Sequence, residues 1–349
     1  MTLMDSLPFF FDKTHEEIRE IFSTLGEPTY RADQVWEGFY VHLAQNPDDI
    51  STLSKSLRGR LSEFLSFSHL TPVTRLESKE KLTVKTLFQM PDGKVIESVL
   101  MRYDERNTLC ISSQSGCAMG CVFCATGQMG FARNLSSGEI IEQVLYYARE
   151  LAATKQVVTN IVVMGMGEPF HNYDAVMDAI RRLNDSTGYN LGARRFTIST
   201  VGIIPKIDQF TGERSQVNLA ISLHAANDEL RSSLLPANKK YPVADLISSC
   251  RNYVEQTHRR ITFEWALIQG VNDSDKDAEE LATLINGILC HVNIIPLNPT
   301  NKYAGKTTTH ERAVAFQAIL TKKGIPCTIR LRRGIEINAG CGQLASTIQ

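Results

Sequence analysis

The feature that most constrains the fold is an alternation of strand-like and helix-like segments from residue 108 to residue 330. The strand-like segments are apolar almost throughout, as is typical of parallel strands that are covered on both faces of a sheet. They are TLCISS (108–113), VVTNIVVMG (157–165), RFTIST (195–200), VNLAISLH (217–224), ITFEWALI (261–268), HVNIIPL (291–297) and PCTIRL (326–331). About six such units predict an α/β fold with parallel strands, arranged as a barrel or partial barrel.

The first part of the chain has a different pattern. Residues 15–26 (HEEIREIFSTLG) carry apolar residues at helical spacing, and Gly26 and Pro28 end the segment. Residues 1–75 are therefore predicted to form a small helical accessory domain. Short alternating runs on either side of the turn Pro91-Asp92-Gly93 predict a linker hairpin over 76–107. The barrel then covers 108–330, and 331–349 form a C-terminal segment.

Charge and composition limit the classes of function. The net charge is −1, so the whole molecule has no attraction for a polyanion, and any nucleic-acid surface must be a local patch. Eight cysteines in 349 residues are too few for a disulfide scaffold and favour metal or redox chemistry. No apolar run approaches the ~20 residues that span a bilayer, and the start of the chain lacks a basic segment typical of a signal peptide. We expect a cytoplasmic protein without a membrane partner.

Three cysteines after the first strand-like run carry the strongest chemical signal. Cys117, Cys121 and Cys124 have the spacing CxxxCxxC on one loop. Three thiolates on a loop ligate three irons of a cubane cluster and leave the fourth iron open, whereas a structural zinc site usually has a fourth Cys or His nearby. The spacing predicts one 4Fe-4S cluster, with zinc or buried free thiols as the alternatives.

Polar residues also follow the later strand-like runs, at the edge of the sheet where ligands bind in parallel α/β folds. Gly167 and Glu168 lie in GMGEP at 165–169, where glycine lets the backbone approach a ligand and the carboxylate accepts hydrogen bonds from an ammonium group. Taken singly, such residues serve equally well as caps or turn residues. The further candidates in this position are Ser199, Ser222, Leu223, His224 and Asn298.

The cysteine spacing after the first strand of a βα series resembles that of the radical S-adenosylmethionine superfamily. Within it, the chain resembles the RlmN/Cfr family of RNA adenine methyltransferases over nearly its whole length. The segments that carry this resemblance are TLCISSQSGCAMGCVFCATG, VVMGMGEP, ISTVGIIP, LAISLHAANDELRSSLLPANKKYP, HVNIIPLNP and IEINAGCGQL. The resemblance implies that S-adenosylmethionine binds the open iron and the strand-end residues, and that cluster reduction cleaves it to a 5′-deoxyadenosyl radical.

The resemblance also implies roles for three residues outside the cysteine triad. Cys341 matches the family cysteine that one S-adenosylmethionine methylates on sulfur; the radical made from a second takes hydrogen from that methyl group, and the methylene radical adds to adenine. Cys110 matches the cysteine that helps remove the ring proton and resolves the adduct by forming a disulfide with Cys341. Glu97 matches an acidic residue assigned as a proton acceptor. Gly340, just before Cys341, replaces the usual alanine.

The substrates and partners that the resemblance implies are 23S ribosomal RNA and transfer RNA, with an electron donor such as flavodoxin, for an enzyme that acts as a monomer. Pro169 and the PLNP segment at 296–299 are closer to the RlmN-type pattern, which predicts methylation at carbon 2 of adenine. A Cfr-like carbon-8 methyltransferase, another radical enzyme that does not use Cys341, and an iron–sulfur RNA-binding sensor are the alternatives.

Overall fold

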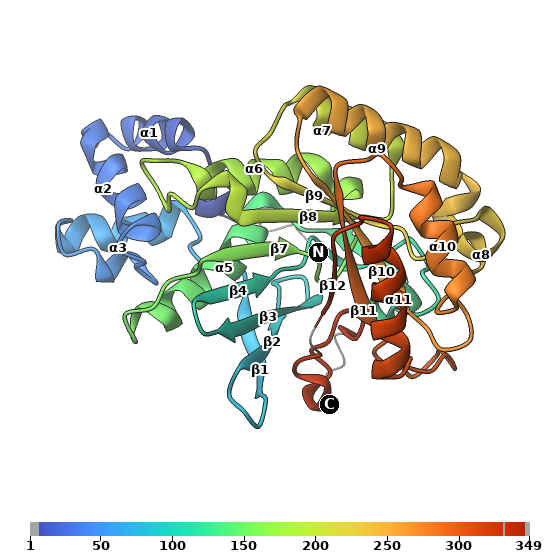
Figure 1. Ribbon diagram of the computed structural model, residues 1–349. Helices are drawn as coiled ribbons and strands as arrows, with labels where there is room; N and C mark the ends of the chain where they lie inside the picture. The colour runs from blue at the N-terminus through green and yellow to red at the C-terminus, as the bar shows by residue number, and fades with distance from the viewer. Residues whose placement is uncertain (1–6, 331, 346–349) are drawn as a thin grey trace.

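The fold is built on one ten-stranded sheet in the order β1-β2-β3-β4-β7-β8-β9-β10-β11-β12 (Figure 1). The computed structural model describes residues 7–330 and 332–345; the parts of the predicted segments at 1–6, 331 and 346–349 lie outside them. The strands of this sheet are β1 (Thr71–Glu77), β2 (Thr83–Gln89), β3 (Val95–Tyr103), β4 (Arg106–Cys110), β7 (Asn160–Val163), β8 (Phe196–Thr200), β9 (Asn218–Ser222), β10 (Ile261–Leu267), β11 (Cys290–Pro296) and β12 (Cys327–Ile329).

The strands from β4 to β12 in this sheet are parallel to their neighbours, as the apolar runs predict. Each of these strands overlaps one of the predicted segments, although β4 and β11 begin before theirs, and their apolar side chains pack in the buried core together with those of the helices. The sheet curves without pairing β1 to β12 in the described part of the chain, so it forms a partial barrel. The α/β fold class is therefore confirmed.

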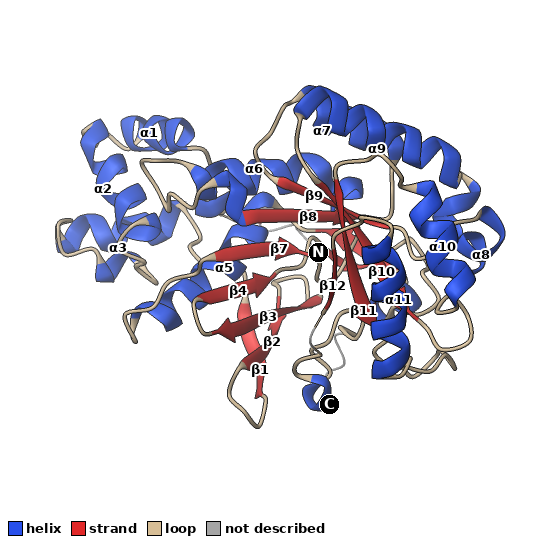
Figure 2. Cartoon of the chain, viewed as in Figure 1, coloured by secondary structure: helices blue, strands red, loops and turns tan. Residues whose placement is uncertain are grey.

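Helices lie outside the curved sheet and cover it (Figure 2). Several begin at side chains that accept hydrogen bonds from free backbone N–H groups; Ser136 and Glu139, for example, form a reciprocal pair at the start of α5. The helices that come after β4 in the chain are α4 (Ala125–Met129), α5 (Ser137–Ala152), α6 (Tyr173–Asn184), α7 (Ile204–Gly212), α8 (Asp228–Leu234), α9 (Val243–Thr257), α10 (Asp275–Leu284) and α11 (His310–Lys322).

The N-terminal part forms the predicted helical unit, with α1 (His15–Thr24), α2 (Thr29–Tyr40) and α3 (Lys55–Phe64) at one end of the molecule (Figure 1). Its core is aromatic, since Phe10 packs against Trp36, Phe39 and Tyr40. The unit is joined to the barrel where the Glu142 carboxylate on α5 accepts hydrogen bonds from Ser68 Oγ and from the backbone N–H groups of His69 and Leu70.

Two details of the first hundred residues differ from the prediction. Residues 71–75, predicted to be helical, belong to strand β1, because the chain pairs there with β2. The hairpin around residues 91–93 is present as β2 and β3, but it is more than a linker. It pairs with β4 and so extends the parallel sheet by an antiparallel meander.

None of the helices in the described ranges is long and apolar enough to cross a membrane.

Candidate active site

A cavity at the carboxyl ends of the parallel strands gathers eleven of the thirteen predicted site residues. They come from five strands or strand ends, the cysteine loop and the C-terminal segment. The eleven that line its wall are Cys110, Cys117, Cys121, Cys124, Gly167, Glu168, Ser199, Ser222, His224, Asn298 and Cys341. Glu97 and Leu223 are the two that are absent from the wall, and both are buried.

The cysteine loop is held by a short two-stranded ribbon, β5 (Gln114–Gly116) and β6 (Phe131–Asn134). Gly116 has φ +74°, and a Cβ there would lie 2.0 Å from the carbonyl oxygen of Gly130, so no other residue fits. The N–H of Cys117 donates to that same oxygen at 2.8 Å. The ribbon therefore fixes where the first cysteine enters the cavity.

The three thiols of this loop are enclosed and repel one another when ionised. Burial raises the pKa of Cys117 to about 12 and that of Cys121 well above its usual value, and the neighbouring Cys124 adds to both shifts. A cationic group among the thiols would offset this and hold them as thiolates.

The arrangement fits a cluster better than a single ion. Within residues 7–330 and 332–345, no three His, Cys, Asp or Glu side chains converge closely enough for one metal ion. In a cubane each thiolate binds a different iron, so the thiolates need not converge on one point. The three residues therefore fit an iron–sulfur cluster with one iron free of protein ligands.

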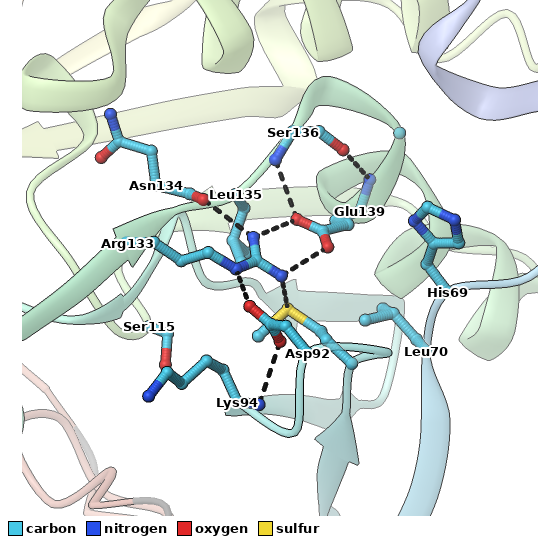
Figure 3. Close-up of polar contacts among 12 residues, drawn as sticks. His69, Leu70, Asp92, Lys94, Ser115, Arg133, Asn134, Leu135, Ser136 and Glu139 are labelled. Atoms are coloured by element: carbon cyan, nitrogen blue, oxygen red, sulfur yellow. Dashed lines mark hydrogen bonds and ion pairs between the residues drawn. The ribbon is translucent and has the colours of Figure 1, made fainter. Parts of the chain in front are cut away.

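Arg133 on β6 connects this ribbon to two other elements (Figure 3). Its Nη1 and Nη2 atoms donate to the two carboxylate oxygens of Glu139 on α5, both at 2.8 Å, and its Nε donates to Asp92 Oδ2 in the β2–β3 turn at 2.5 Å. Glu139 is buried, and its Oε2 atom also accepts from the N–H of Ser136. Arg133 was not predicted as a site residue; the one signal for it in the sequence was that it follows the cysteine triad closely.

Gly167 and Glu168 are placed by contact with the strand that leads to the cysteines. Gly167 has φ +104°, and a Cβ there would lie 2.6 Å from Gln114 Cβ. The Glu168 carboxylate accepts from the N–H groups of Phe170 and Val201, at 3.0 and 2.9 Å. Burial raises the pKa of Glu168 to about 7, with these hydrogen bonds opposing the shift. A bound ammonium group would favour the ionised form.

Ser199 and Ser222 lie near the ends of adjacent strands, with their hydroxyl oxygens 3.4 Å apart. Beneath them, the buried guanidinium of Arg231 donates to the carbonyl oxygens of Val201, Ser222 and Leu223. Leu223, predicted to contact the cofactor, thus contributes its backbone to the support of the site, and its side chain belongs to the core. Arg231 was not predicted, and its only signal was its position in the family-like segment after SLH.

His224 is held neutral in the cavity wall. It has φ +60°, and its Nδ1 atom accepts a hydrogen bond from the N–H of Ala266 at 2.8 Å. Burial lowers the pKa of His224 to about 3. Because Nδ1 is an acceptor, the proton of the neutral ring is on Nε2, which is left as a donor.

Cys110 and Cys341 share the cavity although 230 positions separate them in the sequence. Desolvation by the surrounding protein raises the pKa of the Cys110 thiol to about 12 and that of the Cys341 thiol to about 11, and Arg330 opposes both shifts, although Cys341 as a residue is exposed. All eight cysteines are free thiols. The predicted disulfide between Cys110 and Cys341 is therefore not present in this structure.

The segment that carries Cys341 is fastened to the barrel. Asn298 Nδ2 donates to the carbonyl oxygen of Cys341 at 3.0 Å, so this predicted cofactor ligand holds the segment here. The N–H of Ala125, next to the last triad cysteine, donates to Gly342 O at 2.8 Å. A Cβ at Gly340 would lie 2.6 Å from Asn298 Nδ2, which explains why glycine suits this position in this arrangement.

Glu97 lies behind the cavity wall, where it is 4% exposed. Its Oε1 atom pairs with Lys85 Nζ at 2.9 Å, and its Oε2 atom accepts from the N–H of Ala345 at 3.0 Å. Both oxygens therefore have partners, and one of those partners belongs to the Cys341 segment.

Two charged residues of the wall were not predicted as part of the reacting centre. Glu264, inside the apolar run of β10, accepts from Asn293 Nδ2 at 2.9 Å, and burial raises its pKa. Because Glu264 is the only carboxylate in that apolar run, the sequence could have indicated it as a site residue. Arg330, just after β12, lies in the wall with Cys110 and Cys341.

Comparison with known proteins agrees with this geometry. The Radical SAM superfamily profile matches residues 111–285, and that of the Ribosomal RNA large subunit methyltransferase N-terminal domain matches residues 10–66. A Chloroflexus aurantiacus protein named probable dual-specificity RNA methyltransferase RlmN is 48% identical over 96% of this chain and 92% of its own. Dual-specificity RNA methyltransferase RlmN 1 of Myxococcus xanthus is 43% identical, over 99% and 96%.

A solved structure shows the same fold. The crystal structure of a radical SAM methyltransferase from Sphaerobacter thermophilus superposes with a TM-score of 0.96 and 50% identity, covering 97% of this chain and 100% of that one. The partial barrel and its cysteine loop thus define a radical SAM enzyme. The chain belongs to the RlmN family of radical SAM RNA methyltransferases.

Proposed function

We propose that this protein methylates carbon 2 of an adenine in 23S ribosomal RNA and in transfer RNA, with the methyl group carried on the sulfur of Cys341. The observation that carries the proposal is that Cys341 and Cys110, from distant parts of the chain, line one cavity with the cysteine triad. The names of the relatives, which describe dual-specificity RNA methyltransferases, support the choice of substrate.

Cys117, Cys121 and Cys124 would hold a 4Fe-4S cluster, and the remaining wall residues would hold S-adenosylmethionine. When bound, this pair supplies the electron transfer and the carbon-centred radical that the reaction needs. Glu168 would accept hydrogen bonds from the methionine ammonium group, and His224 would donate from Nε2. Ser199 and Ser222 offer hydroxyl groups, and Asn298 offers its amide once it releases the Cys341 segment.

Cys341 would accept a methyl group from one S-adenosylmethionine, lose a hydrogen atom from it to the radical made from a second, and add to the adenine through the resulting carbon. A ring carbon between two nitrogens is electron-poor, so it cannot act as a nucleophile toward the methyl group of a sulfonium. A carbon radical, in contrast, can add to such a ring carbon. The adduct would lose one electron to the oxidised cluster, and Cys110 would help to remove the ring proton. The sulfur of Cys110 would then bond to that of Cys341 in a disulfide as the carbon–sulfur bond breaks, and the released carbon would take up a proton to become the methyl group. Glu97 would accept a proton only after the Ala345 N–H moves away from it.

The remaining parts of the proposal concern partners. The helical unit, predicted as 1–75, would contact RNA, and its match to the N-terminal domain of ribosomal RNA methyltransferases supports this role. The predicted parts 76–107, 108–330 and 331–349 would serve as hairpin, barrel and carrier of Cys341. The protein would act as a monomer in the cytoplasm, with a flavodoxin-type electron donor.

The test is an anaerobic reaction of the cluster-loaded protein with S-adenosylmethionine, a reductant and RNA, followed by mass spectrometry of the nucleosides. We expect 2-methyladenosine from the parent protein, none from Cys341→Ala, and a covalent protein–RNA adduct from Cys110→Ala. Cys327→Ala is the matched control, because Cys327 lies outside the cavity wall, and it should keep full activity.

Each alternative predicts a different result in the same experiment. Formation of 8-methyladenosine would indicate the Cfr-like reaction. Methylation that persists in Cys341→Ala would indicate another radical mechanism. Absence of 5′-deoxyadenosine in every sample would indicate a sensor and overturn the proposed function.

A further inference from the structure

An ordered stack of two guanidinium groups and one aromatic ring lies beside the active-site cavity. Tyr103, the last residue of β3, pairs with Arg106, the first residue of β4. The guanidinium carbon of Arg106 lies 4.3 Å from the centroid of the Tyr103 ring, and that of Arg333 lies at the same distance from the same centroid. Two guanidinium groups cannot share one face of the ring at that distance, so the ring lies between them.

The two arginines in this stack have most of their hydrogen-bond donors unused. Arg333 donates from Nη1 to the carbonyl oxygen of Arg102 at 2.8 Å, which occupies one of its five N–H groups. In the described part of the chain, neither Arg106 nor Arg333 has a carboxylate partner within ion-pair distance. Asp104 and Glu105 lie exposed in the turn that joins Tyr103 to Arg106, yet neither pairs with them. The stack therefore presents two oriented cations without an anion.

The position of the stack connects it to the reacting thiols. Tyr103, Arg333 and Arg330 all line the cavity that contains Cys110 and Cys341, and Arg106 is exposed outside it. Burial works against the charge of Arg330, but Cys341 and Glu264 raise its pKa overall, so it stays cationic. Positive charge thus continues from the exposed surface at Arg106 to the wall around the thiols. Because the net charge of the protein is −1, the molecule as a whole does not attract a polyanion, and a local concentration of positive charge such as this one is needed to do so.

We propose that Arg106 and Arg333, held on Tyr103, bind the phosphodiester backbone of RNA beside the target adenine. The proposal rests on the proposed function, because an adenine ring reaches Cys341 only when its nucleotide leaves the base stack. The flanking phosphates then lie at the mouth of the cavity. Arginine suits this site because its planar fork stacks on an aromatic ring and still presents donors to phosphate oxygens. Stacking on Tyr103 fixes the orientation of the two guanidinium groups before RNA binds, which lowers the entropic cost of binding.

The test measures the affinity for a short RNA hairpin with an adenine on the 3′ side of its loop, by fluorescence anisotropy, for the parent protein and for Arg106→Gln and Arg333→Gln. Each substitution should weaken binding by about tenfold, the ratio given by one charge-assisted hydrogen bond. Each should also reduce the slope of log affinity against log salt by about 0.7, as expected for one lost contact to single-stranded phosphate. Arg106 is exposed, so its variant tests the proposal even if Arg333→Gln fails to fold.

A second arm places the contact on the RNA. Neutral methylphosphonate linkages are introduced one at a time along the hairpin, and each RNA is measured with the parent and both variants. A linkage next to the adenine should weaken binding by the parent about tenfold and leave the binding of one of the variants unchanged, because the partner of that linkage is already missing. Tyr103→Phe should bind like the parent, whereas Tyr103→Leu should bind like the arginine variants.

The control is Arg312→Gln, which removes a cation on α11 that pairs with Asp275 and does not line the cavity. The proposal would be overturned if Arg312→Gln weakened RNA binding as much as the two arginine variants do. It would also be overturned if, at every position, a methylphosphonate linkage weakened binding by both variants as much as it weakens binding by the parent. Methylation of Cys341 by S-adenosylmethionine is measured separately, without RNA. Its absence from the parent protein would contradict the proposed function, while the binding measurements would still decide the RNA contact.

Discussion

At the residue scale, single side chains in this protein hold the parts of the reaction centre that come from different segments. Arg231 joins two strand ends through their carbonyl groups, and Asn298 holds the backbone of Cys341. Glu97 does the same for Ala345 and is itself paired with Lys85 in a nearly dry environment. Removing one member of such a buried pair leaves the other charge without compensation, which costs more free energy than the intact pair contributes.

We predict that Glu97→Gln lowers the free energy of unfolding by about 3 kcal/mol, the usual cost of breaking a buried ion pair. It should also speed the reaction of Cys341 with iodoacetamide, because the neutral amide of glutamine accepts a weaker hydrogen bond from the Ala345 N–H than the carboxylate does. Thermal unfolding and mass spectrometry of the Cys341 peptide measure the two effects. Adding Lys85→Met should restore stability but leave alkylation fast. Unchanged stability and alkylation in the single variant would show that Glu97 does not fasten the segment.

At the element scale, the cysteine ribbon is positioned by three elements that meet at Arg133. The two hydrogen bonds to Glu139 on α5 are in a buried setting, whereas Asp92 in the β2–β3 turn is exposed. A buried bidentate pair contributes more to local order than an ion pair in water does. Because β6 pairs with β5, which leads into Cys117, the order of the ribbon determines the order of the first cysteine.

We predict that Glu139→Gln speeds the loss of iron from the reconstituted protein to a chelator, by at least several-fold, because Arg133 then loses a buried negative charge and one of its two acceptor oxygens. Asp92→Asn, at the exposed end of the same guanidinium, is the matched control and should lose iron at the parent rate. Iron release is followed by absorbance of the chelate. Backbone hydrogen exchange in residues 114–116 should also rise in Glu139→Gln alone. Equal rates in both variants would contradict the role given to Arg133.

At the scale of the whole molecule, Glu142 is one of several groups that attach the helical unit to the barrel; Arg149 and Arg182 also donate to backbone carbonyl oxygens of that unit. Burial raises the pKa of Glu142 to about 7, while hydrogen bonds from Ser68 and His69 oppose the shift. The folded protein therefore holds the proton more tightly than the unfolded chain, whose carboxyl group titrates near its ordinary value. The stabilisation from this group is complete below the unfolded pKa and is lost as pH rises through about 7.

We predict that the attachment weakens between pH 5 and pH 8, by at most about 3 kcal/mol. Hydrogen exchange of the His69 and Leu70 amides, corrected for the intrinsic effect of pH, measures the attachment directly. Glu142→Gln resembles the protonated form and should abolish the pH dependence while keeping both amides protected. The same pH dependence in this variant would show that another group controls the attachment.

The sequence determined much of the architecture because the relevant patterns are local. Apolar runs at regular intervals predicted the parallel strands, and the spacing of Cys117, Cys121 and Cys124 predicted a cluster loop without reference to the rest of the chain. The strand-end positions of Glu168, Ser222 and His224 followed from the same periodicity, because parallel strands end at one edge of a sheet. Their placement in one cavity agrees with that prediction.

Tertiary structure alone decided which distant residues meet. The joining of β3 to β4 turned a predicted linker into part of the sheet, and residues 71–75 became a strand because β2 offered a pairing edge. Glu97 took a place behind the cavity wall, and Arg133, Arg231 and Glu264 became structural or wall residues through partners far along the chain. Side-chain contacts of this kind depend on how elements pack, and no local period in the sequence encodes them. The fold class and the cluster loop were thus fixed by local chemistry, whereas the support of Cys341 and the arginine stack beside it arose from long-range packing.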